Sequence, residues 1–187
     1  MADPKSSLPK PAMFRVLIQG TVEQVWNEIT KTDEPIAAFF NSRMDVGQLK
    51  AGSKLAMRTP DGKYTGVVGK VLEVIPHKRF SHTFRFTNFD DPECVVIYDL
   101  EPRGDEVQFT LTIESLPTGT KSAKQMLQGG TMIVNTLKAV VETGKPTLGT
   151  RMLFVLFKLM GPFTPKRCLS QNWPVNDDTA VNGERKS

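Results

Sequence analysis

Strict alternation between apolar and polar residues marks the middle of the chain. In residues 79–87 one face carries Phe80, Phe84 and Phe86 together with His82, and the positions between them are polar or charged. This two-residue period is typical of an antiparallel strand that packs one face on a core and leaves the other in water. The strands predicted by such patterns are residues 13–19, 54–58, 63–75, 79–87, 94–101 and 107–114.

Turn signals separate these segments. Residues 60–62 form a Pro-Asp-Gly sequence that is typical of a tight turn. Gly66 and Gly69 interrupt the predicted strand at 63–75, which indicates a bulge or a bend.

A helical period replaces the alternation at residues 120–143. Met126, Ile133 and Leu137 recur on one stripe of this segment, and charged or amide residues lie mostly off it. The two glycines at 129–130 each cost about 1 kcal/mol of helix stability relative to alanine. Our hypothesis is that they let a sheet or a ligand approach the helix closely.

Two short helices are predicted directly after the first strand. Thr21 is a favourable N-cap for a helix over residues 22–30, and Gln24 completes a capping-box pattern. Asp33 is the expected cap of a second short helix that ends near Phe40. The fold class is therefore α+β: one strand, two short helices, about five further antiparallel strands, and a long helix that covers the apolar face of the curved sheet. A curved sheet of this kind leaves a cavity beside its helix.

The ends of the chain differ from this body. Residues 1–12 are rich in proline and polar residues and are expected to be a disordered leader; the domain spans 13–144, and 145–187 form an extension. An apolar run begins at Met152 and ends at Met160, which predicts a short helix that cannot span a bilayer. It is expected to pack on the domain or on a second copy, with a lid or a membrane-surface contact as the alternative. Trp173 is the one evident anchor of the remaining tail.

The distribution of charged residues along the chain narrows the classes of molecule that it is expected to bind. Residues 145–187 hold seven of the 24 basic and three of the 20 acidic residues, so the body balances at 17 and 17 and the extension carries the net charge of +4. A nucleic-acid-binding face on the body is therefore not supported. No signal peptide and no membrane-spanning run are evident, and Cys94 and Cys168 are widely separated, so a reducing, cytoplasmic setting is expected.

Chemical motifs are few. No histidine or cysteine has metal-ligand spacing, and no dinucleotide, phosphate-loop or nucleophile motif is complete, so neither a metal nor a cofactor is predicted. His82 and Tyr98 are polar residues on apolar strand faces. Each is either a core residue with a satisfied hydrogen bond or a polar group inside the cavity, where the two are the candidate acid and base. The residues expected to line the cavity are Trp26, Phe40, Met57, Val68, His82, Phe84, Phe86, Val96, Tyr98, Phe109, Met126, Gly130, Ile133 and Leu137.

Several short motifs together resemble a known superfamily. They are residues 21–26; residues 60–62 with Gly66; residues 71–76 with Arg79 and Phe80; and Gly129 and Gly130 with Leu137 and Glu142. In this order they are similar to the helix-grip superfamily that includes START domains and the birch-pollen allergen group (SRPBCC). Within it, residues 13–144 resemble the AHSA-type branch, related to the activator of the ninety-kilodalton heat-shock chaperone's ATPase. Thr131 stands where that branch usually has a tryptophan, which is expected to enlarge or reshape the cavity.

The resemblance implies a hydrophobic cavity but no single activity, because relatives carry lipids, bind hormones, cyclise polyketides or bind the chaperone. The leading hypothesis is a binding protein for a small apolar or amphipathic molecule. The alternatives are a cyclase- or hydrolase-type enzyme using His82 and Tyr98, and a protein-interaction module. Expected partners are a small apolar ligand and, through the apolar run of the extension or through the sheet, a second copy; nucleic acid and integral membrane association are not expected.

Overall fold

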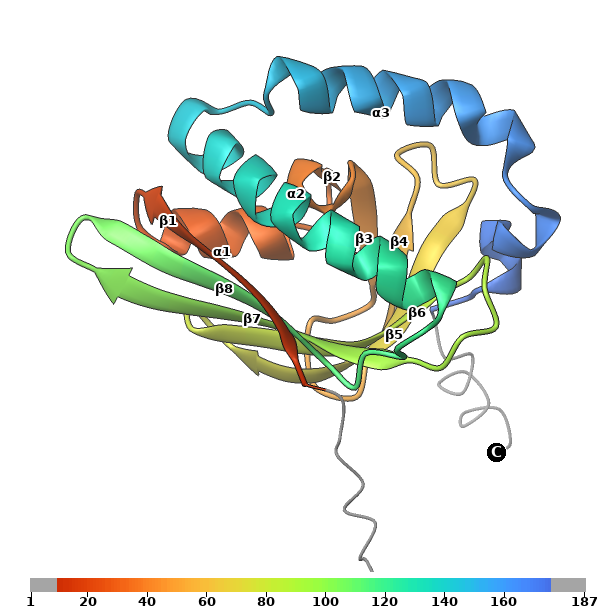
Figure 1. Cartoon of the computed structure of the whole chain (residues 1–187), viewed down its shortest axis with the longest axis horizontal. Coiled ribbons are helices and arrows are strands. Elements are labelled where there is room, and N and C mark those ends of the chain that lie inside the picture. The colour runs from red at the N-terminus through yellow and green to blue at the C-terminus, as the bar shows by residue number, and fades with distance from the viewer. Residues whose placement is uncertain (1–9, 176–187) are drawn as a thin grey trace, which may run out of the picture.

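The computed structural model describes residues 10–175 and has the predicted α+β class: one curled antiparallel sheet of eight strands that embraces a long helix (Figure 1). The strand order is β1-β8-β7-β6-β5-β4-β3-β2. The strands are β1 Ala12–Gln19, β2 Pro35–Ile36, β3 Ser42–Val46, β4 Lys54–Arg58, β5 Thr65–Ile75, β6 Arg79–Phe86, β7 Cys94–Arg103 and β8 Glu106–Glu114. The helices are α1 Val22–Thr30, α2 Lys121–Thr143 and α3 Leu148–Met160, with 3-10 turns η1 Ala37–Phe39, η2 Gly161–Phe163, η3 Lys166–Cys168 and η4 Ser170–Asn172.

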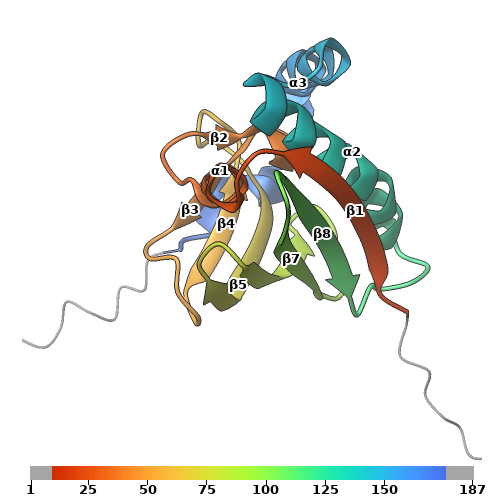
Figure 2. The same cartoon turned by 90° about the vertical axis from the view of Figure 1, so that its left-hand side faces the viewer.

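The long helix α2 has the predicted extent, and both of its ends are capped. Thr120 is its N-cap and accepts a hydrogen bond from the Ala123 amide, and the Ser122 amide donates to the Asp91 carboxylate at 2.9 Å. Gly144 ends the helix in the left-handed conformation that glycine favours. Figure 2, which looks along the sheet, shows the strands curling below α2 so that one face of the helix lies over the concave side of the sheet.

One of the two predicted short helices is confirmed. Thr21 and Gln24 form the complete capping box at the start of α1. The second predicted helix is wrong: β2 and the single 3-10 turn η1 occupy its place. Phe40 and Asn41 then adopt positive φ angles, so the chain reverses into β3 before a full α-helical turn can form.

The sheet has eight strands rather than about six because β2 and β3 gave no strong signal. β2 has two residues and pairs with the start of β3. β3 carries Arg43 and Asp45 and is only partly buried, so it lacks a clear apolar face. The irregularity predicted at the glycines of β5 is present at Gly66, where the register against β4 shifts between Met57 and Arg58. A second shift, against β6, lies between Val71 and Glu73.

The extension crosses the open side of the domain. Figure 1 shows α3 running above α2 at the edge of the molecule, and the chain then descends to the β4–β5 end of the sheet. The predicted anchor, Trp173, lies with its ring 5.5 Å from the Arg85 guanidinium, and a buried arginine that the sequence did not single out also holds the tail. The Arg58 guanidinium donates to the carbonyls of Ser170 and Trp173 at 3.2 and 2.9 Å. The predicted leader at 1–12 lies outside the described residues up to residue 9, and Ala12 already belongs to β1.

Candidate functional site

A cavity of about 610 Å³ lies between the concave face of the sheet and α2, and α3 contributes to its wall. This volume is in the range of small-molecule sites. Nine residues that the sequence predicted as lining lie around it. They are Phe40, Met57, His82, Phe84, Phe86, Val96, Tyr98, Met126 and Ile133.

The other five predicted lining residues lie elsewhere. Trp26, Phe109 and Leu137 are buried in the core beside the cavity. Gly130 contacts the ring of Phe14 on β1 rather than the cavity. Val68 lies on the opposite face of β5, toward the outside of the sheet, and its neighbour Val67 lines the cavity instead.

Sequence reasoning missed two groups of lining residues. One comprises neighbours of predicted positions on the same elements, which the alternation could have identified: Leu111 and Ile113 share the apolar face of β8. The other depends on how distant segments pack: α3 contributes Leu153 and Phe157, and the α2 side chains Gln125 and Gln128 stand at the rim. No local pattern predicts this second group.

His82 and Tyr98 converge inside the cavity. They come from neighbouring strands, where His82 pairs with Val96 and Tyr98 with Phe80. The His82 Nδ1 lies 2.7 Å from the Thr83 carbonyl oxygen, which can only accept, so Nδ1 carries the proton. The Nε2 of His82 is then an acceptor, and the Tyr98 hydroxyl, 3.4 Å away, donates to it. The hydroxyl oxygen keeps its lone pairs for a further donor.

Burial keeps both groups neutral. Desolvation lowers the pKa of His82 from 6.5 to about 4, although the bond to the Thr83 carbonyl opposes this shift. Desolvation likewise raises the pKa of Tyr98 far above its usual value. At neutral pH the pair is therefore an uncharged imidazole and an uncharged phenol in an aromatic surround that includes Phe39, Phe80 and Phe84.

Gly69 makes the backbone contact of His82 possible. A Cβ atom on Gly69 would lie 1.8 Å from the Thr83 carbonyl oxygen and 3.4 Å from His82 Nδ1. Only a residue without a side chain lets β5 approach this carbonyl so closely. Gly69 is therefore a positioning residue for the His82 ring.

The glycines of α2 are explained by aromatic rings that pack against the helix. A Cβ on Gly130 would meet the Phe14 ring at 2.2 Å, and one on Gly129 would meet Phe40 at 3.0 Å. The sheet therefore approaches the helix closely here, as hypothesised. Thr131, however, is exposed, so the expectation that this position reshapes the cavity is wrong: it lies on the outer side of α2.

A second hollow, of about 690 Å³, lies on the outer face of the sheet under residues 172–175. It is more open to solvent and is bordered by charged side chains such as Lys70, Arg85 and Asp90. The inner cavity is less open and contains the paired polar groups, so it is the stronger candidate site.

The described residues contain no set of side chains that could bind a metal ion. Within residues 10–175, no three His, Cys, Asp or Glu side chains are grouped so that they could hold a metal ion. Both cysteines are buried and free, and the Cys94 Sγ lies 3.3 Å from the Met126 Sδ in the cavity wall. Burial raises the pKa of the Cys94 thiol to about 12, so it is not an activated nucleophile.

Comparison with known proteins places this geometry in a family. Residues 19–142 match the family described as "Activator of Hsp90 ATPase homolog 1-like protein". A search among curated proteins found no significant match.

One similar solved structure is DynU16, described as a putative protein in the dynemicin biosynthetic locus. It is 22% identical to this chain, with a TM-score of 0.58. The match covers 73% of this chain but only 48% of DynU16. The Aha1 dimer from Colwellia psychrerythraea is 18% identical, with a TM-score of 0.58, over 73% of this chain and 98% of its own. An HSP90 activator from Plasmodium falciparum is 15% identical, with a TM-score of 0.57, over 73% and 97% of the two chains. These likenesses show the helix-grip fold.

Proposed function

Since this chain belongs to the Activator of Hsp90 ATPase homolog 1-like family, whose fold here encloses a cavity of about 610 Å³, we propose that it binds a small, mainly apolar molecule carrying one hydrogen-bond donor. The observation that carries the proposal is the His82–Tyr98 pair at the wall of a mainly apolar cavity. A buried site of this kind gains affinity from apolar contact and orientation from a few polar groups.

The hydrogen-bond polarity of the pair specifies the polar end of the ligand. Because the Tyr98 hydroxyl donates to His82, its free lone pairs accept. An alcohol or amine N–H fits this position, whereas a carboxylate would be left without a donor and in a desolvated place. Gln125 and Gln128 stand at the rim, where a second polar end of an amphipathic ligand would meet water.

The test is binding of N-phenyl-1-naphthylamine, an apolar fluorophore with one N–H donor. We expect saturable fluorescence enhancement that Val96→Phe abolishes, because residue 96 lines the cavity next to His82. Val95→Phe is the matched control, since residue 95 is adjacent on β7 and lies on the opposite face. Equal binding by both variants, or none by the wild type, would overturn the proposal. Native mass spectrometry of the protein purified from cells, followed by organic extraction, then identifies the resident ligand.

Tyrosine substitution tests the polar end separately. Tyr98→Phe is expected to weaken probe binding about three- to tenfold, in line with one neutral hydrogen bond. Tyr64→Phe is its control, because these are the two tyrosines of the chain and residue 64 lies outside the cavity. If both variants bind the probe like the wild type, the Tyr98 hydroxyl does not contact the ligand.

The enzyme alternative has weaker support. The His82–Tyr98 distance is short enough for both groups to reach one substrate. However, a histidine whose pKa is near 4 is a weak base at neutral pH, and the phenol is a weaker acid than usual. The geometry therefore favours binding over acid-base catalysis.

Family membership favours a second candidate, a chaperone-activating interaction, because one similar structure is described as an HSP90 activator. This function would use the outer surface and would leave the cavity idle. Stimulation of Hsp90 ATPase activity that persists in Val96→Phe would support it. Absence of stimulation with retained probe binding would exclude it.

A further inference from the structure

Helix α3 presents large apolar side chains to solvent along its whole length. None of its thirteen residues is buried. Leu148, Met152, Val155 and Leu159 recur at helical spacing and are 72, 67, 59 and 68% exposed. They form one outward stripe, defined here as the outer stripe of α3. Phe163, just beyond the helix, extends it at 78% exposure. Figures 1 and 2 show α3 as the outermost layer of the molecule on this side.

The opposite face of the helix contacts the domain through Leu153, which is partly buried, and Phe157, which is 46% exposed. Leu153 and Phe157 point toward the domain, where they border the cavity, and Phe157 lies 6.4 Å from Phe40 between ring centroids. Both ends of the segment are attached: residues 144–147 connect it to α2, and the buried Arg58 holds residues 170 and 173. The outer stripe is therefore presented to solvent by a helix that is tethered on each side.

Charge distribution narrows the choice of partner. The segment 143–175 contains five basic residues and no acidic one, and one of the five, Arg167, is paired with Asp90. Arg151 and Lys158 lie on α3 itself, roughly a quarter turn around the helix from the outer stripe. Long basic side chains at the edge of an apolar face reach the headgroup layer of a membrane while the face enters the acyl boundary.

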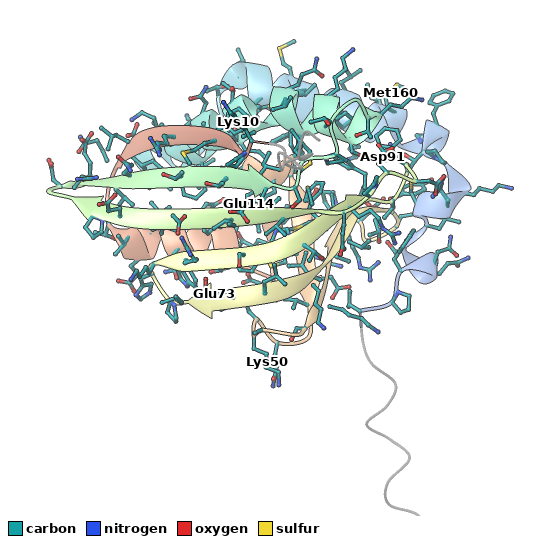
Figure 3. The ribbon with its side chains drawn as sticks, turned by 60° about the horizontal axis from the view of Figure 1, so that its bottom comes forward. Lys10, Lys50, Glu73, Asp91, Glu114 and Met160 are labelled. Atoms are coloured by element: carbon teal, nitrogen blue, oxygen red, sulfur yellow. The ribbon has the colours of Figure 1, made fainter. Side chains whose placement is uncertain are left out.

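A second copy of the chain is a poorer fit. A two-fold contact between outer stripes would bring the Arg151 and Lys158 side chains of the two molecules near one another, and the segment has no carboxylate to pair with them. An anionic membrane surface avoids this repulsion between basic side chains, since it supplies both an apolar layer and negative charge. Of the acidic side chains labelled in Figure 3, Glu73 and Glu114 are drawn over the sheet, and Asp91 is drawn nearer the α3 terminus at Met160.

We propose that the outer stripe of α3 docks the protein on the surface of a membrane that contains anionic lipids. With thirteen residues, α3 is too short to cross a bilayer, and no helix among residues 10–175 qualifies as a membrane span. The helix would lie in the interface plane. Because its other face borders the cavity, docking would place the cavity directly behind α3 at the membrane surface, a consequence that rests on the proposed ligand-binding function.

The test is co-sedimentation of the full chain with vesicles of phosphatidylcholine alone or with 30% phosphatidylserine added (about one lipid in three). We expect strong binding to the anionic vesicles, weak binding to the neutral ones, and loss on raising the salt concentration. Met152→Glu with Leu159→Glu should reduce binding at least tenfold. The matched double variant is Leu72→Glu with Ile75→Glu, at exposed apolar positions of β5, and should bind nearly like the wild type.

Removing charge alone gives a second measurement. Arg151→Gln with Lys158→Gln should weaken binding to anionic vesicles about tenfold or more while leaving the weak binding to neutral vesicles unchanged. Failure of the wild type to bind anionic vesicles, or equal binding by the outer-stripe and β5 double variants, overturns the proposal. So does a dimer in sedimentation velocity that only the outer-stripe variant dissolves, which would assign this face to a second copy.

Membrane docking and ligand binding can be tested independently of one another. Met152 and Leu159 do not border the cavity, so their double variant should bind N-phenyl-1-naphthylamine like the wild type. Vesicle binding without probe binding would leave the membrane contact standing and remove the ligand site. Probe binding without vesicle binding would do the reverse.

Discussion

The Nε2 atom of His82 lies 3.4 Å from the Tyr98 hydroxyl, and both side chains are buried where β6 and β7 face the cavity. The Thr83 carbonyl fixes the proton on Nδ1, so the hydroxyl donates and its remaining lone pairs accept. The two residues therefore act as one unit: the histidine determines the direction of the tyrosine hydroxyl, and the hydroxyl is the polar group offered to a ligand.

This arrangement predicts a pH dependence of stability. Burial lowers the pKa of His82 from 6.5 to about 4. Between these pH values the unfolded chain binds a proton that the folded chain does not, so the free energy of unfolding decreases as the pH falls through this window. The expected contribution is at most about 3 kcal/mol. Denaturant titrations at pH 7 and pH 4 should show a smaller decrease for His82→Gln than for the wild type.

His77→Asn is the control, because His77 is exposed at a positive φ angle that asparagine tolerates. It should retain the part of the pH dependence that arises from His82. An identical decrease for the wild type and His82→Gln would show that His82 does not titrate in this range on unfolding.

Gly69→Ala should damage the site from outside the cavity. Its Cβ would lie 1.8 Å from the Thr83 carbonyl oxygen, so β5 must move away from β6. We expect a loss of about 2–4 kcal/mol in the free energy of unfolding. Gly66→Ala, on the same strand, places its Cβ 4.0 Å from the nearest atom and should change stability by less than about 1 kcal/mol. Equal losses for the two variants would contradict the positioning role of Gly69.

Local pattern was enough to predict the fold class, α2 and the cavity face of β6. The alternation around Phe84 and the helical stripe of α2 depend on burial of one face, and each persists over many residues. The cavity face of β5 was harder to predict. Because of the register shift between Val71 and Glu73, Val71 and Val74 both pack inward although they are three residues apart. A strict two-residue alternation counted back from Val74 therefore places Val68 on the cavity face, whereas Val67 is the residue that lies there.

Other features depend on segments that are distant in the sequence. In the sequence, Arg58 is an ordinary polar residue at the end of a predicted strand. It becomes a buried anchor only because the tail, more than a hundred residues later in the chain, packs against it. Leu153 and Phe157 belong to a run that is apolar on most faces, so periodicity could not say which side meets the domain. Tertiary packing decides such cases.

The contact between Gly130 and Phe14 predicts an exception to helix propensity. Alanine normally stabilises a helix interior by about 1 kcal/mol relative to glycine. At residue 130, however, a Cβ would meet the Phe14 ring at 2.2 Å, so Gly130→Ala should destabilise the protein by about 1–3 kcal/mol. Adding Phe14→Leu should remove part of this loss, which a double-mutant cycle by chemical denaturation measures. Gly149→Ala in α3, with no atom within 4 Å of its Cβ, should not destabilise.

Arg58 should control the attachment of the extension. Its guanidinium donates to the Asp45 carboxylate at 2.5 Å, to the Thr65 hydroxyl at 2.7 Å and to the Ser170 and Trp173 carbonyls. Arg58→Met removes all four bonds and leaves the Trp173 carbonyl without a donor, at a cost of about 2–4 kcal/mol, whereas the Ser170 carbonyl still accepts from the Trp173 amide at 3.0 Å. Amide hydrogen exchange in residues 168–175 should become faster, because the tail loses its buried anchor, while exchange in β7 and β8 stays slow.

Arg103→Met is the matched control for this substitution. Arg103 pairs with Glu101 at 2.9 Å, but both side chains are more than half exposed, so the change should alter stability by less than about 0.5 kcal/mol. If tail exchange is unaffected by Arg58→Met, other contacts hold the extension, and the paired Arg167 and Asp90 become the next residues to substitute. If exchange rises throughout the sheet, Arg58 stabilises the whole domain rather than the tail, and the tethering of α3 must be assigned to its α2 end alone.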